Sequence, residues 1–133
     1  MINAIQIALS GLNAAKTKAD TVASNIANTR TEGALDPANG PAPYGTLTTT
    51  QSAQGNGGVS VTVVPTVKPY VPAYNPDSPF ANADGQVGVP NTDYAAEFVN
   101  LQIASTSYKA NVKTIQISSD MQKDLLAIFD KKA

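Results

Sequence analysis

The stretch that decides the fold is residues 93–132, which read DYAAEFVNLQIASTSYKANVKTIQISSDMQKDLLAIFDKK. Apolar and small residues recur through it in alternating steps of four and three. Side chains at these spacings share one face of a helix, and strict alternation keeps that face turned towards a partner helix. The spacing predicts one helix of roughly 38 residues, about 57 Å long at 1.5 Å per residue. The predicted stripe is Tyr94, Phe98, Leu101, Ser105, Tyr108, Val112, Ile115, Ser119, Gln122, Leu126 and Phe129.

The start of the chain contains a matching pattern. The same alternation runs from residue 2 to residue 26, and only Lys16 interrupts it. This interruption is tolerable, because a lysine can lay its methylenes along apolar surface and keep its charge in water. Gly11 inside this helix is either a weak point or a place where a neighbouring chain approaches closely. The two end segments are therefore predicted to pair as a coiled coil. The stripe is Ile2, Ile5, Leu9, Leu12, Lys16, Ala19, Ala23 and Ile26, widened by Ile7, Ala15 and Val22.

The middle of the chain is rich in β-branched residues and turn formers. Residues 46–50 and 59–64 alternate as strands do, with glycine-rich turn material between them, so we expect a β-hairpin. Prolines restrict residues 66–73 to an edge strand or an extended connector. The predicted fold class is mainly α with a small β insertion, long N- and C-terminal helices pairing as a coiled coil. Residues 1–30 and 93–133 would form one helical core domain, and residues 31–92 the loop, hairpin and connector.

Composition excludes several classes of function. Charged residues are 14% of the chain and the net charge is −1, so no basic surface for nucleic acid is expected. Cysteine and histidine are both absent, which leaves only carboxylates as candidate bases or metal ligands. Asp77 and Asp84 lie in turn motifs that lack the ligand series of a calcium loop. We therefore predict no enzyme activity, no catalytic residue, no metal and no cofactor.

Charged residues fit the ends of the second helix. Asp93 and Glu97 lie in its predicted first turns, after a cap at Asn91 or Thr92, and Lys131 and Lys132 lie at its far end. No run of about 18 apolar residues is present, so we expect no membrane insertion. The first basic residue is Lys16, which argues against a cleaved secretory signal peptide.

Two groups of residues resemble a known family. The motif Ser24-Asn25-Ile26-Ala27-Asn28-Thr29, after an apolar helix containing residues 8–12, is similar to the signature of bacterial flagellar basal-body rod proteins. The segments 74–76, 90–93, 97–100 and 107–111 resemble the proximal-rod branch of that family. One departure is that residues 31–34 read Thr-Glu-Gly-Ala, without the tyrosine that follows the motif in many axial proteins.

The resemblance implies a structural subunit of the proximal rod. Such a chain is exported without a cleaved signal through the flagellar type III apparatus. In the periplasmic rod it assembles into the helical drive shaft that transmits torque from motor to hook and filament. The implied partners are further copies of the chain, other proximal- and distal-rod proteins and the adaptor between the rod and the MS ring. The motif also implies hydrogen bonds between subunits from Asn25, Asn28 and Asn100.

The seams are expected to contact neighbouring subunits, since heterologous contacts that do not close generate filaments. The alternatives are a secreted coiled-coil interaction module, or another axial or needle-type component of a type III export system. An amphipathic membrane binder is disfavoured because the stripes are narrow and poor in basic residues. The predicted subunit-interaction residues are Ile5, Leu9, Leu12, Val22, Asn25, Ile26, Asn28, Tyr94, Phe98, Leu101, Tyr108, Val112, Ile115, Leu126 and Phe129.

Overall fold

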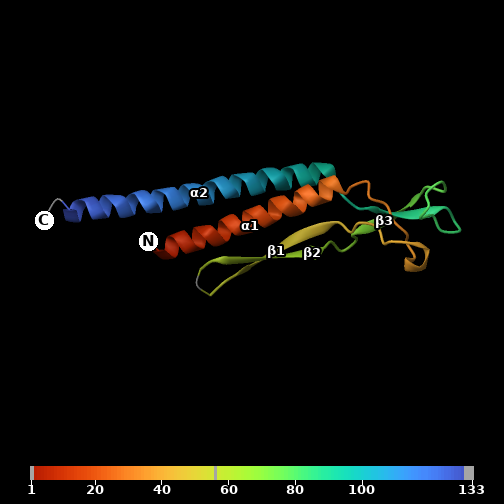
Figure 1. The fold of residues 1–133 in the computed structure, drawn as a ribbon, viewed down its shortest axis with the longest axis horizontal. Helices are drawn as coiled ribbons and strands as arrows, with labels where there is room; N and C mark the ends of the chain where they lie inside the picture. Colours follow the sequence, from red (N-terminus) through yellow and green to blue (C-terminus); the bar gives the residue numbers. More distant parts are fainter. Residues whose placement is uncertain (1, 56, 131–133) are drawn as a thin grey trace.

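The computed structural model describes residues 2–55 and 57–130 as an elongated molecule (Figure 1). In chain order, one long helix comes before and one after two small antiparallel hairpins. The prediction of a mainly helical fold with a small β insertion is therefore confirmed. Lys131 and Lys132, expected at the end of the second helix, lie outside the described residues. The elements are α1 Ile2–Ala27, the short 3-10 helix η1 Pro37–Asn39, β1 Leu47–Ala53, β2 Val59–Pro65, β3 Tyr70–Tyr74, β4 Gln86–Pro90 and α2 Tyr94–Asp130.

Local hydrogen bonds fix the facing ends of the two helices. At the end of α1, the Thr29 hydroxyl donates to the carbonyl oxygens of Asn25 and Ile26. At the start of α2, the Asp93 carboxylate accepts from the backbone N–H groups of Ala95 and Ala96, as an N-cap does. The predicted cap at Asn91 or Thr92 is therefore wrong by one or two residues. Those two side chains instead bond to the middle of the chain.

The helices run antiparallel along the length of the molecule, and α1 lies between α2 and the β1–β2 hairpin (Figure 1). The hairpin pairs Leu47 with Pro65 and Ala53 with Val59, as the alternation of β-branched residues predicts. It is anchored on α1, where the Ser10 hydroxyl accepts a hydrogen bond from the Val59 N–H at 3.1 Å. A two-stranded hairpin is marginal by itself, so this support from the helix is needed.

Small residues form the contact between the helices. Ala8, Ala14, Ala15 and Ala104 are buried, and a Cβ on Gly11 would lie 2.7 Å from the Asn111 side-chain oxygen. Gly11 therefore permits a close approach, but by α2 of the same chain rather than by a neighbouring chain. On α2 the residues turned inward recur every seven positions, at Glu97, Ala104, Asn111 and Ser118.

The apolar stripe predicted on α2 lies beside the inward-turned residues: Val112 and Ile115 are half-buried, but its bulkiest members are not. Tyr94, Phe98, Leu101, Tyr108, Leu126 and Phe129 are all exposed. The hydrophobic pattern alone marked the bulkiest residues as the seam. Small side chains instead allow the helices to approach closely, which leaves the bulky stripe beside the contact.

A second hairpin, β3–β4, forms the end of the molecule away from the helix termini Ile2 and Asp130 (Figure 1). The sequence predicts an extended piece near β3 but not β4, because Gly88 and Pro90 are poor strand formers. Backbone hydrogen bonds between Gly33 and Gly88 tie this hairpin to the loop after α1. A Cβ on Gly33 would lie 2.5 Å from the Pro43 nitrogen, so the joint requires glycine there.

Candidate functional site

Asn25 lies at the centre of a buried polar junction between both helices and the first strand. Its side chain is 1% exposed. The side-chain nitrogen donates to the Leu47 carbonyl oxygen at 2.7 Å and to Glu97 Oε1 at 2.6 Å. The side-chain oxygen accepts from the Leu47 N–H at 2.9 Å and from the Tyr44 hydroxyl at 3.1 Å. All four hydrogen-bonding positions of the amide are thus used within the chain.

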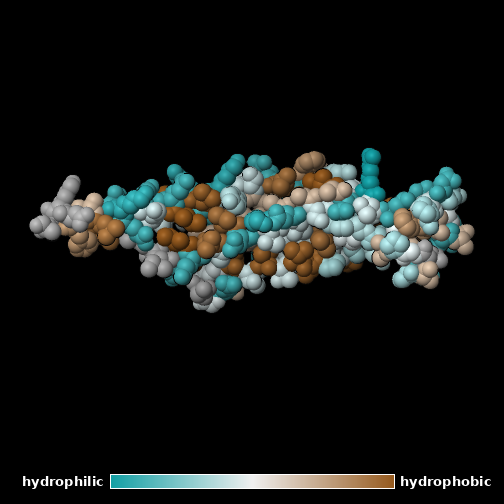
Figure 2. Space-filling model, viewed as in Figure 1, coloured by the Kyte–Doolittle hydropathy of each residue, from teal (hydrophilic) through white to brown (hydrophobic). Residues whose placement is uncertain are grey.

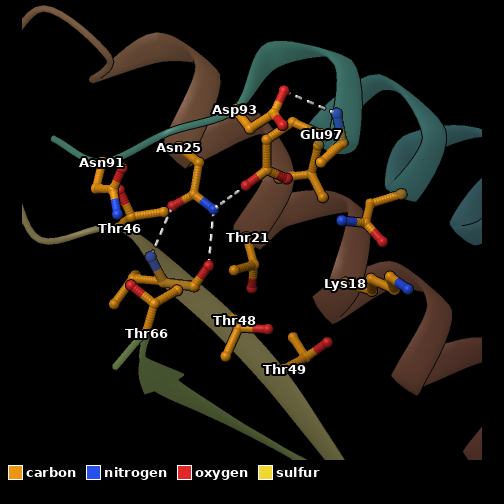
Figure 3. Close-up of a pocket in the computed structure, with 14 residues that line it drawn as sticks. Lys18, Thr21, Asn25, Thr46, Thr48, Thr49, Thr66, Asn91, Asp93 and Glu97 are labelled. Atoms are coloured by element: carbon orange, nitrogen blue, oxygen red, sulfur yellow. Dashed lines mark hydrogen bonds between the residues drawn. The ribbon is translucent and has the colours of Figure 1, made fainter. Parts of the chain in front are cut away.

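Figure 3 shows how the junction is assembled from distant segments. Asn25 comes from the last turns of α1 and Glu97 from the first turns of α2, where the helix dipole favours a negative charge. Glu97 is only 8% exposed. Sequence reasoning singled out Asn25 and Glu97 separately but missed their contact and the part played by Tyr44. Pairing across 72 positions has no signal in a single sequence.

A polar cavity of about 260 Å³ opens beside the junction. Five threonines contribute to its walls, and the buried Thr66 hydroxyl oxygen has no hydrogen-bond partner among the described residues. Within the described ranges, no three carboxylates lie close enough together to hold a metal ion. Hydroxyl, amide and charged side chains make up most of these walls, so the cavity suits water or a polar side chain.

Asn28 and Asn100 have different surroundings. The Asn28 side chain donates to the Ser24 carbonyl oxygen and accepts from the Thr31 hydroxyl, which caps α1. This agrees with the capping role that the residue types suggest for the end of the first helix. Asn100 lies in the wall of the cavity. Contacts of these asparagines with a neighbouring subunit stay a prediction.

A second polar cluster joins the loop after α1 to the β3–β4 hairpin. Glu32 accepts hydrogen bonds from the Ser78 hydroxyl at 2.7 Å and from the Asn75 amide at 3.0 Å. The hydrogen bond from Ser78 is the larger cause, and that from Asn75 the smaller, of a Glu32 pKa below its ordinary value. The cluster fixes the distal hairpin to the helical part of the chain.

The predicted interaction residues fall into three groups. Val22 and Asn25 are buried inside the subunit, and a middle group is partly exposed: Ile5, Leu12, Ile26, Asn28, Val112 and Ile115. The remaining seven are between 36% and 65% exposed: Leu9, Tyr94, Phe98, Leu101, Tyr108, Leu126 and Phe129. In Figure 2 such apolar residues reach the surface along the helical part of the molecule.

Part of the exposed set lines a groove between the helices. Leu101 and Tyr108 from α2 meet Ala15 and Ala19 from α1 around a hollow of about 290 Å³. The groove is lined by residues of α1 and α2 alone, whereas a separate hollow borders the β1–β2 hairpin. We call the first hollow the interhelix groove.

A second apolar stripe on α2 escaped the sequence analysis. It comprises Val99, Ile103, Ile117, Met121, Leu125 and Ile128, between 44% and 59% exposed. Its spacing of four, four and three from Ile117 onwards is visible in the sequence. The pattern is interrupted between Ile103 and Ile117, and the more continuous neighbouring stripe concealed it.

Family models of known proteins match two parts of the chain, one that contains most of α1 and one that contains most of α2. Residues 5–34 match the family described as "Flagella basal body rod protein", and residues 83–128 match "Flagellar basal body rod FlgEFG protein C-terminal". The chain is 32% identical to the flagellar basal-body rod protein FlgC of Salmonella typhimurium, over 96% of this chain and 97% of that protein. It belongs to the FlgC family of flagellar basal-body rod proteins.

Other FlgC proteins show the same extent of similarity. The chain is 34% identical to FlgC of Escherichia coli O157:H7 over 96% of its length, and 29% identical to FlgC of Bacillus subtilis over 95%. The two family matches cover most of α1 with its asparagine motif, and α2 with β4. The resemblance to rod proteins stated from the sequence is thus confirmed.

Neither helix in the described part of the chain has a segment with the length and hydropathy needed to cross a membrane.

Proposed function

We propose that this chain is a structural subunit of the flagellar proximal rod, where it assembles with copies of itself into a helical drive shaft. The observation that carries this proposal is the large apolar surface left uncovered on an elongated helical molecule. Monomeric soluble proteins rarely expose contiguous apolar area of this kind without a partner. Membership of a family of basal-body rod proteins supports the same conclusion.

The energetics favour assembly through the helices. Fully burying a leucine, isoleucine or phenylalanine side chain contributes roughly 1.5–3 kcal/mol. A few such residues per contact are enough to hold a subunit firmly. Contacts between different faces of identical subunits do not close into a ring unless the rotation fits, so they generate open helical polymers.

The finer features of the proposal follow from that assembly. Residues 1–30 and 93–133 act as one helical core domain that winds as a coiled coil, and residues 31–92 form the loop, β-hairpin and extended connector between them. Other proximal- and distal-rod proteins and the adaptor to the MS ring are the partners above and below. The chain is exported to the periplasmic rod without a cleaved signal peptide, and it has no enzymatic activity.

Substitution of an exposed apolar residue on α2 tests the function. We expect Leu101→Asp to abolish swimming motility while expression and far-UV circular dichroism of the purified chain stay unchanged. The charge would be buried in the subunit contact, whereas in the free chain the side chain of residue 101 reaches solvent at the rim of the interhelix groove. Val112→Asp should act in the same direction.

The matched control is Val67→Asp, since Val67 is 100% exposed and lies outside both helices. Normal motility with Leu101→Asp and Val112→Asp would refute a rod role for this face. A purified chain that stays monomeric at all concentrations, and is absent from isolated basal bodies, would favour a free-standing interaction module instead.

A further inference from the structure

The interhelix groove has a lining that suits the binding of an amphipathic helix. Its apolar lining is Ala15 and Ala19 from α1 and Leu101, Ala104 and Tyr108 from α2, and Lys16, Ser105 and Lys109 complete its border. The buried Ala104 and the larger side chains of Leu101 and Tyr108 border a hollow of about 290 Å³. Helix-in-groove recognition uses an apolar groove of this kind to accept side chains spaced three or four apart.

The second stripe of α2 has the complementary shape. Ile117, Met121, Leu125 and Ile128 follow steps of four, four and three, so they form one ridge along the helix. All four are about half exposed. The ridge extends towards the free end of α2, beyond the start of α1 (Figure 1). Among the described residues, no helix of the same chain therefore covers its last part.

A lysine borders the interhelix groove and an aspartate borders the ridge. Lys109 borders the interhelix groove. Asp124 borders the ridge, because it is three residues after Met121 and four before Ile128. Among the described residues, the ion pairs are Lys16 with Asp20 and Lys123 with Asp120, so neither Lys109 nor Asp124 has a partner there. A copy seated with its ridge in the groove would bring this lysine and aspartate to the same border.

We propose that the ridge of one subunit occupies the interhelix groove of the next copy of this chain. This inference rests on the proposed function, and it specifies which two surfaces meet. The groove and the ridge are different parts of one molecule, so the contact is heterologous and repeats from copy to copy. Each subunit offers one of each, which yields a continuous row of copies rather than a closed dimer.

Cysteine cross-linking in isolated basal bodies tests the contact, because the chain has no cysteine of its own. The first pair is Ser105→Cys in the groove with Met121→Cys on the ridge. Within one chain these positions are about 24 Å apart along α2. A disulfide needs Cα atoms within about 7 Å, so it can form only between chains. Under mild oxidation we expect a ladder of covalent dimers, trimers and larger species.

Matched controls separate this contact from general crowding in the rod. The pair Ser105→Cys with Gln116→Cys is the control, because Gln116 precedes the ridge residue Ile117 and points about 100° away round the helix. Each single cysteine variant and the control pair should stay monomeric. A second pair, Ala19→Cys with Leu125→Cys, tests the same contact between ridge and groove from the α1 side.

The outcomes distinguish the inference from the function it rests on. Intact basal bodies that contain both variant pairs but give no ladder would overturn the proposed seat and leave the rod function standing. A cross-link to a different rod protein in place of a second copy would also overturn it. Absence of the unsubstituted chain from isolated basal bodies would instead refute the proposed function.

Discussion

The Asn25 side chain connects three segments that are distant in the sequence. It bonds to Leu47 at the start of β1, to Glu97 in α2 and to the Tyr44 hydroxyl. No other side chain type of that size offers two donors and two acceptors in this geometry. The residue thus fixes where the hairpin leaves the helices and how α1 and α2 are aligned.

Replacing Asn25 should destabilise the fold strongly. Asn25→Ala leaves the Glu97 carboxylate and the Leu47 backbone groups buried without partners, and each such group costs about 1–3 kcal/mol. We expect the free energy of unfolding to fall by about 2–4 kcal/mol in urea denaturation. Asn13→Ala, at an exposed position of α1, is the control and should change it by under about 0.5 kcal/mol. Equal effects would show that the junction is not the source of stability.

Gly11 and Asn111 should be energetically coupled. In an Asn111→Ala background, Gly11→Ala should stabilise the chain by up to about 1 kcal/mol, the usual gain in helix propensity. In the unsubstituted chain the gain should shrink or reverse, because the new Cβ would meet the Asn111 side-chain oxygen at 2.7 Å. A double-mutant cycle by thermal unfolding measures the difference. An identical change in both backgrounds contradicts the close approach.

At the scale of elements, α2 carries three stripes with different tasks. Small and polar residues at seven-residue intervals face α1, and two bulky apolar stripes beside them stay exposed. The distal β3–β4 hairpin is a separate element, attached through Gly33, Gly88 and the Glu32 cluster. Hydrogen bonds attach it to the loop after α1, and Val87 of β4 and Ala34 of the loop are buried at this end of the molecule.

Acid should loosen the distal hairpin. The pKa of Glu32 is lowered by its bonds to Ser78 and Asn75 from the ordinary value of 4.5. Its contacts therefore stabilise the folded state above that value, and the stabilisation is lost as the pH falls through the lowered pKa. Titration of Glu32 by carbon NMR should show Ser78→Ala raising the pKa towards 4.5. An unchanged titration midpoint would exclude the Ser78 hydroxyl as the cause.

At the scale of the whole molecule, the chain is elongated and buries few large apolar side chains. Its buried apolar residues are mostly alanine and valine, while the bulky side chains lie outside. Gly11 lies against Asn111, so the antiparallel helices bring the start of α1 beside about residue 120 of α2. Beyond that point α2 continues alone (Figure 1).

The free end of α2 should fray in dilute solution and become ordered on assembly. We expect backbone amides of residues 121–130 to exchange with solvent much faster than those of residues 97–118, which pack on α1. In the assembled rod both segments should be protected. Hydrogen exchange read by mass spectrometry compares the two states. Uniform protection of α2 in the dilute monomer would show that the exposed stripes need no partner.

The sequence alone determined the two long helices, the first hairpin and the family. These features depend on local spacing, turn residues and short motifs, which a single chain displays directly. The tertiary structure alone decided which stripe of α2 faces α1, the pairing of Asn25 with Glu97, and strand β4. The physical reason is that close packing selects small and complementary side chains across distant segments, whereas hydrophobic pattern marks only what is apolar. Bulky residues such as Phe98 and Tyr108 satisfy the pattern but lie outside the narrow contact, which small residues such as Gly11 and Ala104 fill.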